Sequence, residues 1–196
     1  MQPAPLIIVS GPSGSGKSTL IRRVLEHPPY PLRLAVSATT RPQRVGEVEG
    51  VHYHFWTPER FREQLEAGAF LEHAVVHGKH QYGTPRSEVD GYREQGIGVI
   101  LDIDVQGAAL VRPLYPDLLS IFVALSRWDM YEERLRGRGS ESDESIARRL
   151  ATAQRELARQ GEYQFLIHND DLDRAVSQFR DLLLQHSATR STTSGR

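Results

Sequence analysis

The chain has 196 residues, of which 39% are hydrophobic and 25% charged, and its formal net charge is −1 at pH 7. These values are typical of one globular domain with a real core, and they disfavour a nucleic-acid binder that depends on bulk positive charge. The absence of cysteine excludes disulfides, thiolate zinc sites and a cysteine nucleophile, and without a membrane-length apolar run or a signal-peptide pattern we expect a cytoplasmic protein with no membrane contact.

The predicted elements follow from hydrophobic spacing and from turn residues. A continuous apolar run indicates a strand buried on both faces, whereas apolar residues three and four apart indicate a helix. In chain order the predicted elements are strand 6–10, helix 18–26, strand 34–36, antiparallel strand 52–56, a helix from Thr57-Pro58 to Gly68, helix 86–95, strand 97–104, strand 118–125, a helix that begins at Ser126 with Asp129 completing its cap, strand 163–168 and helix 175–183.

Strands that alternate with helices predict an α/β fold, a three-layer structure with a parallel sheet covered on both faces. Two stretches depart from this core: residues 37–84 are polar and rich in turn residues, and residues 127–162 are rich in Arg. We therefore expect a single domain over 1–186, with a core of about 5–36, 85–126 and 163–186. Residues 187–196 contain no apolar anchor, and we expect them to be disordered.

A phosphate-binding motif follows the first strand. The segment Gly11-Pro12-Ser13-Gly14-Ser15-Gly16-Lys17-Ser18 fits the P-loop pattern, and Thr19 follows it. Glycines allow backbone N–H groups to approach an anion, and the amides of the following helix N-terminus attract phosphate. In this motif the Lys contacts the β- and γ-phosphates of a nucleoside triphosphate, and the hydroxyl after it is a ligand for Mg²⁺. The sequence therefore predicts a site for a nucleoside triphosphate with Mg²⁺ as cofactor.

Residues 37–84 are the candidate site for the group that accepts the phosphoryl. They open with Ser37-Ala38-Thr39-Thr40-Arg41-Pro42-Gln43-Arg44. Arg41 and Arg44 lie three residues apart with a rigid Pro between them, so both guanidinium groups can converge on one monophosphate. The alternative is that they are two solvated surface arginines.

Several further motifs resemble guanylate kinases, and they do so in order from about Ile7 to about Leu184. They are Arg41-Pro42-x-Arg44-x-Gly46-Glu47-x-x-Gly50-x-x-Tyr53-x-Phe55, Phe70-Leu71-Glu72, Tyr82-Gly83-Thr84, Leu101-Asp102-Ile103-Asp104-Val105-Gln106-Gly107 and His168-Asn169-Asp170-Asp171-Leu172. The stretch Gly78–Tyr82 is one residue longer than the usual spacing in that family. The resemblance implies a P-loop kinase core with an inserted nucleoside-monophosphate-binding subdomain over about 37–84 and a helical lid over about 127–162.

The resemblance also implies a reaction, ATP + GMP = ADP + GDP, and a role for each matching residue. The P-loop residues 11–19, together with Arg134 and Asn169, would bind ATP. Lys17, Arg138 and Arg149 would be catalytic, and Ser18, Asp102 and Asp104 would face the metal. The residues implied for GMP binding are Ser37, Arg41, Arg44, Tyr53, Glu72, Tyr82, Thr84 and Asp102, with Glu72 and Thr84 on the guanine edge and Asp102 close by.

Two other functions remain open at this point. A P-loop kinase could act on a phosphorylated sugar, in which case Glu72 would have no guanine to recognise. A non-catalytic binding module on the same scaffold is the second alternative, although such a module has no need of Lys17 and Ser18. Arg136, Arg155 and Arg159 are expected to be solvated partners of acidic residues. We expect GMP/GDP and ATP/ADP as the ligands, with no nucleic acid and no obligatory protein partner.

Overall fold

The computed structural model describes residues 3–76, 79–137 and 142–193, and it has the α/β core that the alternation of elements predicts. Five parallel strands form the core sheet, with β1 at its centre. In sheet order they are β2 (Leu32–Leu34), β7 (Gly98–Asp102), β1 (Leu6–Ser10), β8 (Leu119–Ala124) and β9 (Phe165–His168).

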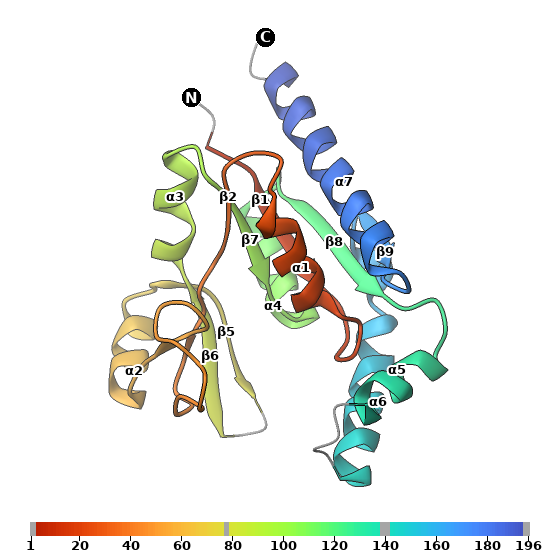
Figure 1. Cartoon of the computed structure of the whole chain (residues 1–196). Coiled ribbons are helices and arrows are strands. Elements are labelled where there is room, and N and C mark those ends of the chain that lie inside the picture. Colours follow the sequence, from red (N-terminus) through yellow and green to blue (C-terminus); the bar gives the residue numbers. More distant parts are fainter. Residues whose placement is uncertain (1–2, 77–78, 138–141, 194–196) are drawn as a thin grey trace.

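Helices cover both faces of this sheet, so the core has three layers (Figure 1). The side chains of β1 alternate between the two faces: Ile7 and Val9 pack with α1 and α7, and Leu6 and Ile8 pack with α4. All four are fully buried, as expected for a strand whose sequence is apolar at every position. The covering helices are α1 (Lys17–Glu26) and α7 (Leu172–Thr193) on one face and α4 (Val105–Val111) on the other.

A second, mostly antiparallel sheet lies within the polar stretch after β2, and we call this part, residues 37–85, the insert. Its small core contains Ala38, Phe61 and Phe70. The elements are β3 (Ala38–Thr39), β4 (His54–Phe55), α2 (Pro58–Glu66), β5 (Phe70–Val76) and β6 (His80–Pro85), with sheet order β4-β3-β6-β5.

The Arg-rich stretch forms the helices α5 (Asp129–Arg136) and α6 (Asp143–Leu157), which we call the lid helices. Arg138 belongs to the stretch between them and lies outside the described residues. Figure 1 shows the insert and the lid helices on opposite sides of the region below the carboxyl ends of β1, β7 and β8. The remaining elements are short: η1 (Arg86–Glu88), α3 (Asp90–Glu94), η2 (Arg112–Leu114) and η3 (Gln160–Glu162).

Two strand predictions need correction. The second strand is β2 at Leu32–Leu34 and not 34–36, because the N–H of Val36 turns away from the sheet to donate to the Glu88 carboxylate at 3.2 Å. The strand predicted as antiparallel at 52–56 is β4, which pairs parallel with β3. The long loop between β3 and β4 brings the chain back in its original direction, and the alternation of side chains cannot report that.

Two helix predictions also differ from the structure. Residues 86–95 form η1 and α3, separated at the fully buried Val89. The lid helix begins at Asp129 without a side-chain cap, because the N–H of Ser126 donates to Asp170 at 3.0 Å and Asp129 pairs with Arg127.

The C-terminal region was expected to be disordered from residue 187, but α7 continues to Thr193. Arg190 supplies the anchor that hydrophobic patterning missed, since it forms an ion pair with Asp117 and donates to the carbonyl of Pro3 at 2.6 Å. Over the described ranges, none of the helices has the length and apolar character needed to cross a bilayer.

Candidate active site

The P-loop lies between β1 and α1, where backbone geometry requires glycine. A Cβ on Gly11 (φ 155°) would stand 2.1 Å from the carbonyl oxygen of Val123, and one on Gly16 (φ 81°) would stand 2.4 Å from Nδ2 of Asn169. Gly16 is also the N-cap of α1, which has no side-chain cap and no acidic residue in its first turn. The first amides of α1 therefore face the loop without a competing carboxylate, which is the arrangement that binds phosphate.

Two residues expected to bind ATP support the P-loop from behind. Nδ2 of Asn169 donates to the carbonyl of Ser15 at 2.8 Å, and Arg134 donates to the carbonyl of Asn169 at 2.9 Å and reaches that of Ser15 at 3.5 Å. Asn169 is 3% exposed. Both residues therefore lie against the P-loop, as expected. Their hydrogen bonds join the backbone of the loop to the residue that follows β9.

Lys17 and Ser18 meet a carboxylate at the end of β7. Lys17 forms an ion pair with Oδ1 of Asp102, and the Ser18 hydroxyl donates to Oδ2 of the same group at 3.1 Å. Asp102 was expected on both the guanine side and the metal side, and its hydrogen bonds are to the P-loop. Asp104, two residues later, caps α4, where its Oδ1 accepts from the amides of Gln106 and Gly107 at 2.9 and 2.8 Å.

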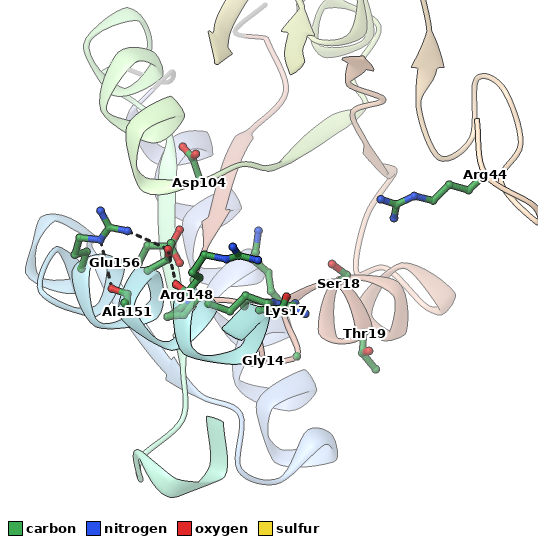
Figure 2. A pocket seen from close by; sticks show the side chains of 17 residues that line it. Gly14, Lys17, Ser18, Thr19, Arg44, Asp104, Arg148, Ala151 and Glu156 are labelled. Carbon is green, nitrogen blue, oxygen red and sulfur yellow. Dashed lines mark hydrogen bonds between the residues drawn. The ribbon is translucent and has the colours of Figure 1, made fainter. Parts of the chain in front are cut away.

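An open cleft joins these groups to the lid and the insert (Figure 2). Its floor is the P-loop and the start of α1, α6 forms one wall, and Arg44 reaches it from the insert. Arg149 of α6 donates to the hydroxyl of Ser13, so the lid touches the P-loop directly. The cleft is lined by Gly11, Pro12, Ser13, Gly14, Gly16, Lys17, Ser18, Thr19, Arg44, Asp104, Ser145, Arg148, Arg149, Ala151, Thr152, Arg155 and Glu156.

Glu156 and Arg148 are cleft residues that the sequence analysis missed. Burial raises the pKa of the Glu156 carboxyl, and the negative charge of Asp104 raises it further while Lys17 opposes the shift. A carboxylate among phosphate-binding groups is unexpected, and the only sequence signal was its place within the expected helical lid. Arg155, predicted to be a surface residue, hydrogen-bonds within its own helix to Ala151 and Thr152, yet it lines the cleft.

In the insert, Arg41 is buried and held from two sides. Its guanidinium makes two hydrogen bonds to Glu47, at 2.7 and 3.0 Å, and its Nε donates to the hydroxyl of Tyr82 at 3.1 Å. Tyr53 stands edge-on to Tyr82, with ring centroids 5.7 Å apart, and 5.5 Å from the Arg41 guanidinium carbon. The structure thus brings Arg41, Tyr53 and Tyr82 together, as the sequence predicts.

Glu47 is a functional candidate that received no role from the sequence. Besides pairing with Arg41, its carboxylate accepts from the N–H of Arg44 at 2.8 Å. These two hydrogen-bond donors lower the pKa of Glu47 to about 2. The spacing of an acid three residues after Arg44 and six after Arg41 was the available signal.

A buried acid and two hydroxyls lie further along the sheet of the insert, where Thr84 follows Tyr82 by two residues on β6. The Thr84 hydroxyl donates to Oε1 of Glu72 at 2.6 Å, and the Ser37 hydroxyl is 3.4 Å from that of Thr84. Glu72 is 9% exposed, and burial raises the pKa of its carboxyl. A Cβ on Gly107 of α4 would come within 3.0 Å of its other oxygen. Glu72 and Thr84 therefore lie together, as the resemblance implies, whereas Ser37, which was expected on the phosphate side with Arg41, lies beside Thr84.

Known proteins with similar sequences and structures are guanylate kinases. The family model described as guanylate kinase matches residues 3–186. A guanylate kinase of Idiomarina loihiensis is 45% identical over 91% of this chain and 85% of its own length, and one of Symbiobacterium thermophilum is 47% identical over 93% and 86%. The crystal structure of guanylate kinase from Anaplasma phagocytophilum has a TM-score of 0.77 at 27% identity and covers 95% of this chain and 87% of its own. The chain belongs to the guanylate kinase family.

Proposed function

We propose that the cleft between P-loop, lid and insert is where this chain performs its family's reaction, ATP-dependent phosphorylation of GMP (ATP + GMP = ADP + GDP). Family membership over nearly the whole chain makes it a kinase with these two nucleotides as substrates. The observation that carries the proposed location is that P-loop, Arg149 and Arg44 line one cleft. The P-loop and Arg149 on the donor side and Arg44 on the acceptor side therefore border the same space.

On the donor side, the backbone amides of residues 11–19 bind the phosphates of ATP. Lys17 provides the positive charge that contacts the γ-phosphoryl group during transfer. In this structure that charge is paired with Asp102. Arg149, in contact with Ser13, is placed to add a second positive charge over the same phosphates. Arg138 completes this set in the proposal, from a position outside the described residues.

The residues at the end of β7 fit Mg²⁺ as cofactor. This ion prefers oxygen ligands, and it is held by one or two carboxylates together with substrate phosphates. Ser18 and Asp102 offer a hydroxyl and a carboxylate oxygen 3.1 Å apart, and Asp104 keeps one oxygen outside its helix cap. When bound there, Mg²⁺ would neutralise charge on the β- and γ-phosphates.

On the acceptor side, Arg41, Arg44, Tyr53 and Tyr82 hold the phosphate of GMP, and Glu72 recognises the base. Guanine presents N1–H and an exocyclic amine side by side, and an ionised carboxylate can accept from both. Thr84 donates to that carboxylate at 2.6 Å, and the hydroxyl of Ser37 contacts Thr84, so hydrogen bonds fix the position of the base-reading group.

No general base is needed for the transfer. The acceptor phosphate is already largely ionised at neutral pH, because the second pKa of a phosphate monoester is about 6. Catalysis then rests on holding two anions in line and on stabilising the charge that moves between them. The arginines on both walls and Lys17 supply that stabilisation in this proposal.

The test is a substrate panel. ADP production is measured with ATP and Mg²⁺ against GMP, dGMP, AMP, CMP, UMP and a set of sugar phosphates. We expect GMP to be preferred over AMP by orders of magnitude, since Glu72 would face a lone pair on adenine N1. A sugar phosphate as the preferred acceptor would overturn the assignment of Glu72, and no turnover with any acceptor would indicate a binding module. The proposed reaction takes place in the cytoplasm, where both nucleotides occur, and requires no protein or nucleic-acid partner.

A further inference from the structure

A histidine stands between two carboxylates where the insert joins the core. Nδ1 of His54, in β4, is 3.1 Å from Oε1 of Glu49, and Nε2 of the same ring is 3.1 Å from Oε1 of Glu88. None of the roles assigned above involves these three residues. The His54 side chain is 25% exposed and that of Glu88 14%.

Glu88 belongs to the core side of this junction. Its Oε2 accepts from the Arg33 guanidinium of β2 at 2.7 Å and from the N–H of Val36 at 3.2 Å, and Arg33 also lies 3.6 Å from the centre of the Tyr92 ring. The next residue, Val89, is fully buried in the core cluster. One carboxylate thus touches both chain segments that connect core and insert.

Glu49, in contrast, is fixed to the insert. Its Oε2 accepts from the N–H of Phe55, the residue after His54, at 2.7 Å. The imidazole also stacks on Trp56, with ring centroids 6.1 Å apart. Within the insert His54 contacts Glu49 and Trp56, and its Nε2 reaches across to Glu88 on the core side.

Hydrogen-bond chemistry decides the charge of this ring. An ionised carboxylate can only accept, and a neutral imidazole has one N–H and one lone pair. Both contacts are hydrogen bonds only if both ring nitrogens carry a proton. The other charged groups nearby are Arg33, which is paired with Glu88, and Arg60, whose guanidinium lies over the Trp56 ring and adds a positive charge near Glu49.

We propose that His54 is a positioning residue: in its imidazolium form it bridges Glu49 and Glu88, pins the insert to the core and makes GMP binding depend on pH. Loss of one proton turns one of the two contacts into a lone pair facing a carboxylate, and the pin weakens. Tyr53, next in the chain, would move with it, and the Tyr53 ring lies beside Arg41 and Tyr82. The inference rests on the proposed GMP site for its effect on affinity, although the pin itself does not.

The pin is tested first without nucleotide. Ring ¹⁵N shifts of His54, assigned by the peak that disappears in His54→Gln, report whether each nitrogen is protonated. We expect both to be protonated at pH 6, and we expect Glu88→Gln to lower the pH at which the ring loses its proton. Glu94→Gln, an exposed acid of the neighbouring α3, is the matched control and should leave the titration unchanged. A neutral ring at pH 6, or a titration that Glu88→Gln does not move, would overturn the pin.

The effect on GMP is tested by comparing wild type with His54→Gln from pH 6 to pH 8. The ratio of their KM values for GMP cancels the ionisation of GMP itself. The imidazolium form of His54 is lost as the pH rises. The KM for GMP of His54→Gln, divided by that of wild type, should therefore be about 3- to 10-fold smaller at pH 8 than at pH 6. This change corresponds to the free energy of one hydrogen bond. The wild-type to His54→Gln ratio of KM for ATP, and the same ratio of kcat, should stay constant over this pH range. A KM ratio for GMP that stays flat while the ¹⁵N titration is as expected would overturn the pH-dependence, whereas failure of the GMP site itself would appear in the wild-type substrate panel.

Discussion

The two sites proposed for the nucleotides would hold their phosphates by different means. The P-loop offers backbone amides on a turn whose shape is set by Gly11 and Gly16 and supported from behind by Asn169. The insert offers side chains, and its central cation, Arg41, is already bonded to Glu47 and Tyr82. One site is a shape of the main chain, and the other is a network of charged and hydroxyl groups.

This difference has consequences for how each site responds to mutation. The P-loop offers mainly backbone groups, so few of its side chains can be removed by mutation. In the proposed site, activity would depend on the charge of Lys17 and on the lid helices beside it. A side-chain network depends on every partner, because removing one of them leaves another buried polar group without its hydrogen bond. We therefore expect large, concentrated effects on the ATP side and smaller, distributed effects on the GMP side.

The largest effect is expected from Lys17→Met. A P-loop Lys contacts charge that develops during transfer, so kcat should fall by about 10³-fold or more while the circular dichroism spectrum is unchanged. Lys79, the other lysine of the chain, is exposed in the turn before β6 and provides the control Lys79→Met. A near-normal kcat in Lys17→Met would rule out this P-loop as the place of phosphoryl transfer.

Arg149→Ala should reduce kcat by about 10²- to 10³-fold, because cations contributed to a transferring phosphoryl group are worth that much or more. KM for GMP should change little, since Arg149 donates to Ser13 of the P-loop, on the donor side. The exposed Arg174 of α7 gives the matched control Arg174→Ala. A change confined to KM for GMP would contradict this prediction and would assign Arg149 to the binding of the acceptor.

The next effect tests the insert through its base-reading acid. Glu72→Gln should lower kcat/KM for GMP by about 10²-fold, because the amide accepts at one atom only. The ratio of kcat/KM for GMP to kcat/KM for AMP should therefore decrease. Arg41→Ala should weaken the binding of GMP and AMP together, since in the proposed site Arg41 contacts only the phosphate that both nucleotides carry. A GMP/AMP ratio like that of wild type in Glu72→Gln would show that this buried acid does not read the base.

The same difference between the sites explains what the sequence could predict. A P-loop is a local pattern, and a strand buried on both faces is a local apolar run, so residues 6–19 could be identified from their neighbours alone. The groups around Arg41 and Glu72 were identified by resemblance, because their partners come from different strands. Asp102 matched the expected edge of the sheet, but its bonding to Lys17 and Ser18 depends on how β7 and β1 align.

Other features had no local signal. The parallel pairing of β4 with β3 depends on the path of a long loop, and the helical structure beyond residue 187 depends on an ion pair between Arg190 and Asp117, 73 positions earlier in the chain. Glu88 has an ordinary sequence context, and its three partners lie 34 to 55 residues away. Polar contacts between distant elements follow from the fold and cannot be read before it is known.

The smallest effect concerns Glu47, whose carboxylate both orients Arg41 and neutralises it. In Glu47→Gln the amide keeps one acceptor, so Arg41 loses part of its fixed geometry and KM for GMP should rise by about 3- to 10-fold, with KM for ATP unchanged. Glu66→Gln, an exposed acid at the end of α2, is the control. Tighter GMP binding would instead make Glu47 an anion that competes with the phosphate.

Thermal unfolding of the same variant gives an independent measure. Arg41 and the N–H of Arg44 lower the pKa of Glu47 to about 2, below the usual value of about 4.3. A carboxyl whose pKa is depressed in the folded state contributes stability above its unfolded pKa and loses it as the pH falls through the folded one. The difference in Tm between wild type and Glu47→Gln should therefore be constant from pH 7 to about pH 5 and disappear towards pH 2. A difference that persists at pH 2 would mean that the ionised carboxylate is not what holds Arg41.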